Sequence, residues 1–281
     1  MKKDCKRILS FALALTACAA PMLFISCAHN APQNTDLETS SEPTTTAPIK
    51  TELKLRVGSY NIKHGAEAGG DLSLIAETIK NAGLDICGVQ EVDYKTTRCG
   101  GVDQPAELAA ASGLEYYRYT PAIDYQGGKY GTLILSRYPI ESFEYTLLPS
   151  ADKEQRAIGH AVINIDGTKI DFFNTHLSHE SAGLRIIQFK ELHEMLAECE
   201  HYILTADFNT EKFSEFDVLN YGSLVNSDEH RHVTFPGHSS AIDNIVLSAD
   251  FTVTDTATVQ RSYSDHHMLY SDLTLTLKTK E

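Results

Sequence analysis

The sequence predicts an α/β domain with a mixed sheet, on three features of residues 51–281. Several short apolar segments are typical of strands, and two longer segments are typical of helices. Strand-like and helix-like segments alternate only in part along the chain, so a purely parallel sheet is not expected. Polar side chains follow or close most of the strand-like segments, which places a candidate site at strand ends.

The composition is that of an acidic globular protein. The 281 residues are 42% hydrophobic and 9% aromatic and carry a formal net charge of −14. The first 27 residues hold four basic residues and one acidic residue, so the remainder has a net charge near −17. Nonspecific nucleic-acid binding depends on basic side chains, so this acidity argues against a high-affinity DNA binder. It does not exclude an enzyme that meets phosphate through a bound metal ion.

Residues 1–27 have the pattern of an export signal. Four basic residues among the first seven precede an apolar run from Ile8 to Ile25 and then Ser26-Cys27. An uncleaved transmembrane anchor is the alternative, but the run is short for a span and Pro21 interrupts it. The segment resembles a bacterial lipoprotein signal, which implies a protein held by lipid on the cell membrane, outside the cytoplasm. Cys27 is the expected lipid-attachment residue because cleavage there leaves a polar arm, and Cys18, within the better-matching motif, is the alternative.

Residues 28–50 are rich in Thr, Ser, Pro, Asn and Ala, and we expect a flexible linker there. The catalytic domain is expected to span residues 51–281. It contains only Cys87, Cys99 and Cys199. An odd number argues against a disulfide framework, although a bond between two of them stays open. Cys87 lies in an apolar stretch and is expected to be a small core residue.

The first elements follow from local pattern. Residues Leu53–Val57 alternate in polarity and lead into Asn61, as a strand does. A buried strand at Ile86–Val89 presents Gln90-Glu91, and the polar stretch 93–104 behind it is long enough to shape a site. Between these strands we expect a helix that Asp71 caps and Gly83 ends. Its apolar face is formed by Leu72, Ile75, Ala76 and Ile79.

The remaining elements are read from apolar segments in the second half of the domain. We expect a second helix near Ala182–Ala197. Six further strands are expected at Gly131–Ser136, Ala161–Ile165, Ile170–Asn174, Tyr202–Thr205, Ile242–Leu247 and Leu269–Leu277.

Six groups of polar residues follow or close these strands and are expected to converge. Burying several carboxylates together is costly without a cation, and oxygen-rich ligation suits Mg²⁺ or Mn²⁺. The six groups contain Asn61, Gln90-Glu91, Asn174 with His176, Asp207 with Asn209, Asp243, and Asp265-His266.

The order and spacing of these groups carry a family resemblance over about residues 53–277. The marks are Ser59–Ile62, Val89–Val92, Gly131–Ile140, Asn174–Leu177, Ala206–Asn209, Ile242–Ile245 and Ser264–His266. The chain resembles the endonuclease/exonuclease/phosphatase superfamily, which includes deoxyribonuclease I. The resemblance implies a deoxyribonuclease I-like fold, a four-layer α/β sandwich of two packed mixed β-sheets flanked by helices.

The resemblance also implies a role for each polar group. Glu91 binds the metal, Asn61 holds a ligand or metal-bound water, and Asp265 completes the site. Asp207 positions or deprotonates the attacking water, and Asn209 holds that water or a phosphoryl oxygen. His266, oriented by Asp243, steadies the phosphate or exchanges a proton, and His176 faces it near the leaving oxygen.

Other residues bear on substrate choice. Arg156 resembles a family arginine that contacts substrate phosphate, and a solvated surface charge is its equal alternative. Arg98 in the polar loop is a weaker substrate-binding candidate. Two residues depart from the family pattern, Ala206 for a glycine and Asn244 for an aromatic residue that would line a pocket. Five further histidines show no tight zinc-ligand spacing: His179, His230, His232, His238 and His267.

Three functions remain open from the sequence. The first is a monomeric extracytoplasmic phosphodiesterase or phosphatase that acts on a lipid headgroup or small phosphoester. The second is a secreted nuclease, whose partner is nucleic acid. Basic side chains around the site would favour this function. The third is an inactive binding module, which the retention of every expected polar group argues against.

Overall fold

The structure is a computed structural model that describes residues 51–260 and 263–277. The signal segment with Cys18 and Cys27, and the linker of residues 28–50, lie outside the described residues. Within the described part, we find no helix with the length and apolarity that a membrane span needs.

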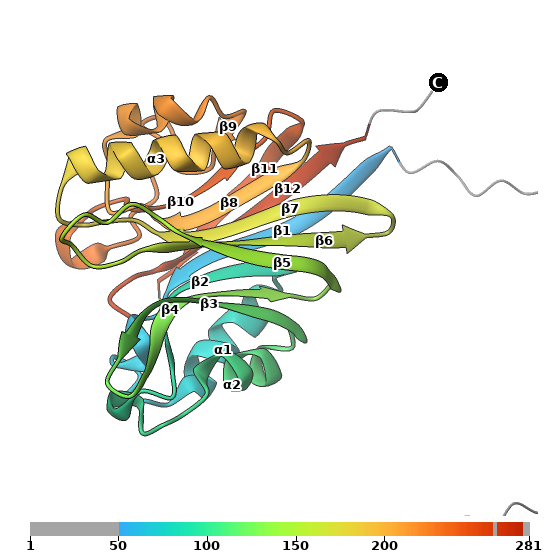
Figure 1. Ribbon diagram of the computed structural model, residues 1–281. Helices are drawn as coiled ribbons and strands as arrows, with labels where there is room; N and C mark the ends of the chain where they lie inside the picture. Colours follow the sequence, from blue (N-terminus) through green and yellow to red (C-terminus); the bar gives the residue numbers. More distant parts are fainter. Residues whose placement is uncertain (1–50, 261–262, 278–281) are drawn as a thin grey trace, which may run out of the picture. The chain divides into compact units, whose positions relative to one another are not determined.

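Two six-stranded sheets form the framework (Figure 1). The first has the order β11-β12-β1-β2-β4-β3, with bounds Phe251–Val259, Met268–Thr276, Glu52–Asn61, Ile86–Tyr94, Gly128–Ser136 and Tyr116–Tyr125. The second has the order β5-β6-β7-β8-β10-β9, with bounds Ile140–Leu147, Ala157–Ile165, Thr168–His176, Tyr202–Asp207, Asp243–Leu247 and Ser223–Leu224. Each sheet is mixed, because β1 pairs with β2 and β7 pairs with β8 in parallel while the other pairs are antiparallel.

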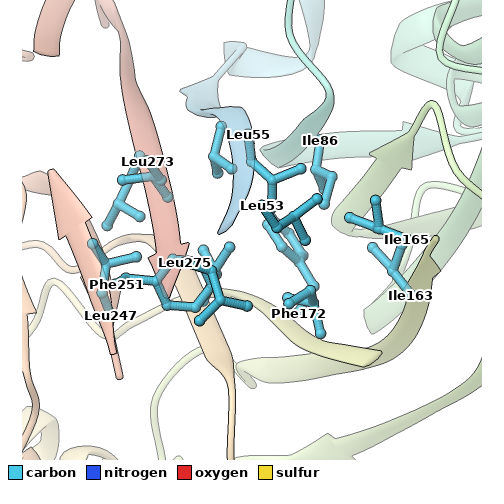
Figure 2. Packing of buried hydrophobic residues seen from close by; sticks show 14 of the residues in the cluster. Leu53, Leu55, Ile86, Ile163, Ile165, Phe172, Leu247, Phe251, Leu273 and Leu275 are labelled. Atoms are coloured by element: carbon cyan, nitrogen blue, oxygen red, sulfur yellow. The ribbon is translucent and has the colours of Figure 1, made fainter. Parts of the chain in front are cut away.

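Three apolar layers hold the sheets and helices together. The inner layer lies between the two sheets and includes Leu55, Ile86, Phe172 and Leu273 (Figure 2). A second layer lies under α1 (Leu72–Ala82) and α2 (Gln104–Ser112), on the outer face of the first sheet. A third lies under α3 (Ala182–Ala197), on the outer face of the second sheet. The predicted sandwich of two packed mixed sheets with helices outside is confirmed.

The predicted capping of α1 is present in the structure. The Asp71 carboxylate accepts a hydrogen bond from the Ser73 backbone N–H, and Gly83 closes the helix at φ +68°. That φ lies in the left-handed region, which glycine adopts without a Cβ penalty. Cys87 is fully buried, and the three described cysteines are free thiols.

The predictions omitted α2, β3, β5 and β11, together with the two-residue β9. Most residues of β5 are exposed, and β11 has few buried ones, so neither presents the apolar pattern used to find strands. Helix α2 begins at Gln104, where the polar stretch ends, and its alanines give only a weak apolar stripe.

A buried polar joint ties the two sheets together at the middle of the sandwich. Asn174 of β7 donates through Nδ2 to the Val89 and Leu133 carbonyls of the opposite sheet, at 3.0 Å each. Gln90 of β2 donates to Asn174 Oδ1 at 2.8 Å. The sheets approach so closely here that a Cβ on Gly88 would lie 2.0 Å from Thr205 Oγ1 and 2.6 Å from Asn174 Oδ1.

Gly88→Ala is therefore expected to destabilise the domain by about 1–3 kcal/mol, because the added methyl group overpacks the joint. Urea unfolding measures the free energy of unfolding. Gly183→Ala is the matched control, since Gly183 lies in α3 and a Cβ added there would meet no described atom within 4 Å. The control is expected to be neutral or to stabilise by up to about 1 kcal/mol. Equal stability of the two variants would show that the joint tolerates a side chain at Gly88.

Candidate active site

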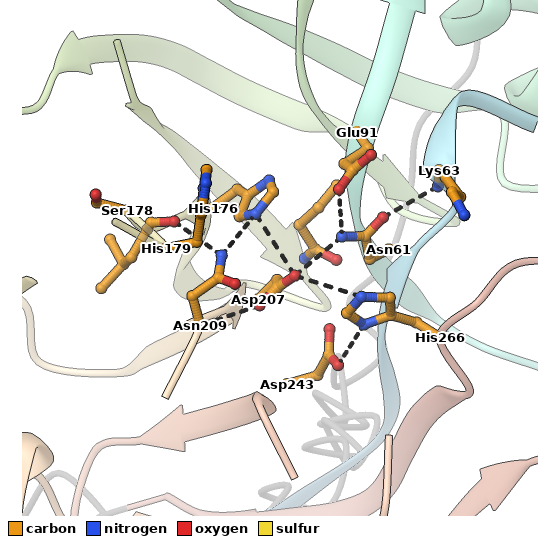
Figure 3. A network of polar contacts seen from close by, with 12 residues as sticks. Asn61, Lys63, Glu91, His176, Ser178, His179, Asp207, Asn209, Asp243 and His266 are labelled. Carbon is orange, nitrogen blue, oxygen red and sulfur yellow. Dashed lines mark hydrogen bonds and ion pairs between the residues drawn. The ribbon is translucent and has the colours of Figure 1, made fainter. Parts of the chain in front are cut away.

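Most of the predicted polar residues meet around one cavity at the ends of several strands (Figure 3). Gln90 and Asn174 do not line it and lie in the joint between the sheets instead. Asn61 closes β1, His176 closes β7 and Asp207 closes β8, while Asp243 begins β10. The cavity has a volume of about 370 Å³ and is lined by Glu91, Tyr130, Glu154, Arg156, His176, His179, Asp207, Asn209, Phe235, Ile242, Asp265 and His266.

Asp207 lies at the centre of the network. Its Oδ2 accepts a hydrogen bond from Asn61 Nδ2 at 2.9 Å, and its Oδ1 accepts one from the Asn209 backbone N–H at 2.9 Å. His176 Nε2 and His266 Nε2 lie 3.5 and 3.7 Å from the same Oδ2. Burial and the Asp243 carboxylate raise the pKa of Asp207, which makes it a stronger base than an exposed aspartate.

His266 and Asp243 form a buried histidine–carboxylate pair. His266 Nδ1 lies 2.8 Å from Asp243 Oδ2, and the Phe235 ring packs against the imidazole with 4.7 Å between centroids. Burial opposes the charged ring, but the carboxylates of Asp243, Asp207 and Asp265 outweigh it and raise the pKa of His266. The pair fixes the ring so that Nε2 points toward Asp207.

His176 has the opposite electrostatic character. Burial and the positive charge of Arg156 keep its pKa well below the usual range, so the ring is neutral. Asn209 Nδ2 lies 2.9 Å from His176 Nε2 and also donates to the Leu177 carbonyl. Since an amide N–H only donates, His176 Nε2 accepts this hydrogen bond. The two histidines on either side of Asp207 therefore differ in their affinity for a proton.

Asn61 links the residues predicted to hold the metal to the rest of the network. Asn61 Nδ2 donates to Glu91 Oε1 at 3.0 Å, and both Glu91 and Asp265 line the cavity. Glu91 has φ +58° and lies in a β-bulge, where the register between β2 and β4 shifts after Val89. A bulge re-aims a side chain, and a left-handed non-glycine residue costs free energy, so local strain is used to direct the Glu91 carboxylate.

Sequence reasoning missed Lys63, which Figure 3 shows beside Asn61. Its Nζ lies 3.0 Å from Asp265 Oδ2 and 2.8 Å from Glu67 Oε1, and its backbone N–H donates to Asn61 Oδ1. The available signal was its position two residues after Asn61, directly behind the first motif.

Arg156 lies in the cavity wall and is only 4% exposed, so the alternative of a solvated surface charge is wrong. Its Nη1 pairs with Glu154 at 3.1 Å and its Nη2 lies 3.3 Å from His179 Nδ1. Its Nε is buried without a hydrogen-bond partner among the described residues. A guanidinium held this way can still take an anion from the cavity.

Arg98 does not line this cavity. Its guanidinium binds the buried Asp93 carboxylate through two hydrogen bonds of 2.7 and 2.8 Å and lies over the rings of Tyr125 and Tyr130. Tyr130 lines the cavity, so Arg98 contacts a wall residue without itself being part of the lining. Its predicted role in substrate binding stays a prediction.

The two departures from the family pattern lie away from the cavity lining. Asn244 holds the backbone N–H and carbonyl of Asn226 through its side-chain amide, and Ala206 is a buried β8 residue. Asn244 is not among the described residues that line the cavity, so the expected change of a pocket wall at this position is not seen.

The cavity carries an excess of negative charge. Glu91, Glu154, Asp207 and Asp265 line it, with Arg156 as the one arginine among the lining residues. Buried Asp243 adds another carboxylate, and its Oδ1 has no hydrogen-bond partner among the described residues. A phosphate would be repelled here unless a cation were present, so the donor set fits a divalent ion with oxygen ligands. Asp207, Asp243 and His266 also place ligand atoms within 4.8 Å of one another.

Two packed mixed sheets with helices outside define a deoxyribonuclease I-like α/β sandwich. The model of the Endonuclease/Exonuclease/phosphatase family matches residues 58–266. The chain belongs to this family, whose members hydrolyse phosphoester bonds and generally use a divalent metal.

Three solved structures share the fold. An endonuclease/exonuclease/phosphatase from Beutenbergia cavernae is 22% identical with a TM-score of 0.67, over 79% of this chain and 72% of that one. The mannosyl-6-phosphatase Bt3783 from Bacteroides thetaiotaomicron is 19% identical with a TM-score of 0.56, over 78% and 99%. D. rerio TDP2, complexed with single strand DNA product, is 18% identical with a TM-score of 0.58, over 78% and 98%.

One named relative matches by sequence. Protein cwh43 of Schizosaccharomyces pombe is 30% identical over 125 residues, which is 44% of this chain. The matched region spans only 13% of the length of that protein.

His266→Gln is expected to lower kcat by about 10²–10⁴-fold, the range for loss of a general acid or base. Glutamine is preferred to alanine because its amide can still donate to Asp243, whose buried charge would otherwise be left unpaired. Steady-state kinetics at saturating metal measures the loss.

Asp243→Asn is the graded partner of this variant and is expected to be milder, because the ring stays in place while its orientation is weakened. Circular dichroism checks that both variants remain folded. Near-wild-type turnover in His266→Gln would mean that another residue carries the role.

Proposed function

We propose that the protein is a Mg²⁺- or Mn²⁺-dependent phosphodiesterase or phosphatase that acts outside the cytoplasm on a lipid headgroup or small phosphoester. The observation that carries the proposal is the charge of the cavity, where four carboxylates are only partly offset by Arg156 in the lining and by Lys63, which pairs with Asp265. Such a lining suits a compact substrate that enters with a metal ion, and it offers a polyanion little beyond that ion.

The proposed chemistry divides among the cavity residues. Asn61, Glu91 and Asp265 hold the ion, which neutralises charge on the phosphate oxygens when bound. Asp207 holds and deprotonates the attacking water, with Asn209 fixed beside it by the Asp207 Oδ1 hydrogen bond. His266 steadies the phosphoryl group or exchanges a proton, and neutral His176 faces the leaving oxygen.

Arg156 is the proposed contact for a phosphoryl oxygen. Its burial in the wall, among Glu154 and His179, restricts the guanidinium to one side of the cavity. A fixed cation in the wall would help to orient a phosphate bound to the metal ion, which favours in-line attack.

Activity is expected to require added Mg²⁺ or Mn²⁺ and to disappear with EDTA, since the proposed ligands are carboxylate and amide oxygens. Hydrolysis of bis-p-nitrophenyl phosphate by metal-stripped protein, before and after metal is restored, measures this. Zinc is not expected to be needed for turnover. Full turnover of stripped protein in chelator would contradict the proposed chemistry.

Membrane attachment through Cys27 is part of the proposal. Strand β1 begins beside the end of β12, where the Leu277 N–H donates to the Thr51 carbonyl, and Asn61 lies at the other end of β1. Ten strand residues span roughly 33 Å. If residues 28–50 form the flexible linker expected from their composition, about twenty residues would have a root-mean-square reach on the order of 25 Å. We propose that such a reach lets the site meet headgroups, which would raise the rate of encounter.

The protein is expected to prefer a small or membrane-presented phosphoester over duplex DNA, because its acidity repels a polyanion. Initial rates on plasmid DNA, sphingomyelin, phosphoinositides and bis-p-nitrophenyl phosphate at physiological salt provide the comparison.

The nuclease is the second candidate, and Lys63 and Arg156 near the site are the observation in its favour. Plasmid cleavage far faster than hydrolysis of every lipid and small phosphoester would promote that function.

A further inference from the structure

A second group of metal-ligating side chains lies away from the candidate active site. His160 of β6, Asp171 of β7 and Cys199, just after α3, place an imidazole nitrogen, a carboxylate oxygen and a thiol sulfur within 4.8 Å of one another. Asp171 lies five residues before His176 on β7, which is roughly 17 Å along the strand. These residues line a separate cavity of about 330 Å³.

The geometry around His160 suits a ligand. Its Nε2 lies 2.8 Å from Asp171 Oδ1, and its Nδ1 lies 3.5 Å from Glu144 Oε1 on the neighbouring strand β5. The ring stacks on Phe173 with 4.2 Å between centroids, which fixes its plane. An imidazole that faces a metal through one nitrogen and a carboxylate through the other is a recurring arrangement in metal sites.

The charges around the cluster are unbalanced. The cavity is lined by Glu144, Asp171 and Glu198, and the described lining includes no lysine or arginine. A bound cation would balance these carboxylates. Met195 lines the same cavity, and its backbone carbonyl accepts a hydrogen bond from the Cys199 thiol at 3.5 Å.

We propose that His160, Asp171 and Cys199 form a binding site for a Zn²⁺-like transition-metal ion. One nitrogen, one oxygen and one sulfur ligand match zinc, and three protein ligands beside an open cavity leave a fourth position for water. Mg²⁺ is excluded by its preference for oxygen ligands. The ion would link the C-terminal end of α3 to β6 and β7, and its role is to stabilise the outer face of the second sheet.

The test uses full-length protein with Co²⁺ as a spectroscopic probe for Zn²⁺, in excess Mg²⁺. The expected result is a thiolate-to-metal charge-transfer band that saturates at a single equivalent of Co²⁺ and disappears when Zn²⁺ is added. The candidate active site has no cysteine in its lining, so Co²⁺ bound there would give no thiolate band. Its outcome does not depend on catalytic turnover, so it is separate from the test of the proposed function.

Cys199→Ser is expected to abolish the band, and His160→Gln to weaken Zn²⁺ binding by about a hundredfold or more. Cys99→Ser is the matched control, because Cys99 is also a partly buried free thiol but contacts Thr96 in another part of the fold. It should keep the band. Zn²⁺ should also raise the melting temperature of the wild type and not that of Cys199→Ser.

Absence of the band in the wild type, or its persistence in Cys199→Ser, would overturn the proposal. So would equal effects of Zn²⁺ on the melting temperatures of the wild type and Cys199→Ser. The cluster would then be a hydrogen-bonded histidine–carboxylate pair beside a partly buried thiol.

Discussion

The buried Asn174 amide is the interaction on which the arrangement of the site depends. It joins β7 to β2 and β4 across the sandwich through two carbonyls, and Gln90 completes the joint. Glu91 directly follows Gln90, and His176 lies two residues after Asn174. Because sheets that pack only through apolar side chains can slide, a directional hydrogen bond at this point fixes the register between the two halves of the site. Loss of a buried partner would leave amide groups unpaired, at about 1–3 kcal/mol each.

The site contains buried charges and backbone conformations that lower the stability of the folded state. Asp207 and Asp243 are both almost fully buried, and Glu91 and Asn209 have left-handed backbone conformations. Two buried carboxylates are tolerated because His266 lies between them and Asn61 and Asn209 donate to Asp207. The remaining negative charge is the physical reason for expecting a metal ion, since binding it relieves repulsion that the fold leaves uncompensated.

The fold could be predicted where sequence pattern reports burial. The apolar runs of β2, β7 and β8 end in motif residues. These strands, and the convergence of the polar residues that follow them, could therefore be predicted. The edge strands β5 and β11 were missed because most of their residues are exposed or half-buried. The burial of Arg156 and the pairing of Lys63 with Asp265 depend on contacts distant in sequence, which no local pattern encodes. The same holds for the group of His160, Asp171 and Cys199.

The two cavities differ in donor chemistry, and this difference bears on how a single chain could keep two metals apart. Around Asp207 the proposed ligands are oxygens, with the nearby histidines held by Asp243 and Asn209. Around Cys199 the donors are an imidazole, a carboxylate and a thiol. Affinity for first-row ions rises toward zinc at any such set, so selectivity must come from ligand type. A thiol placed only at the distant cavity would draw a soft ion there and leave the oxygen-rich cavity to Mg²⁺ or Mn²⁺, which the proposed hydrolysis requires.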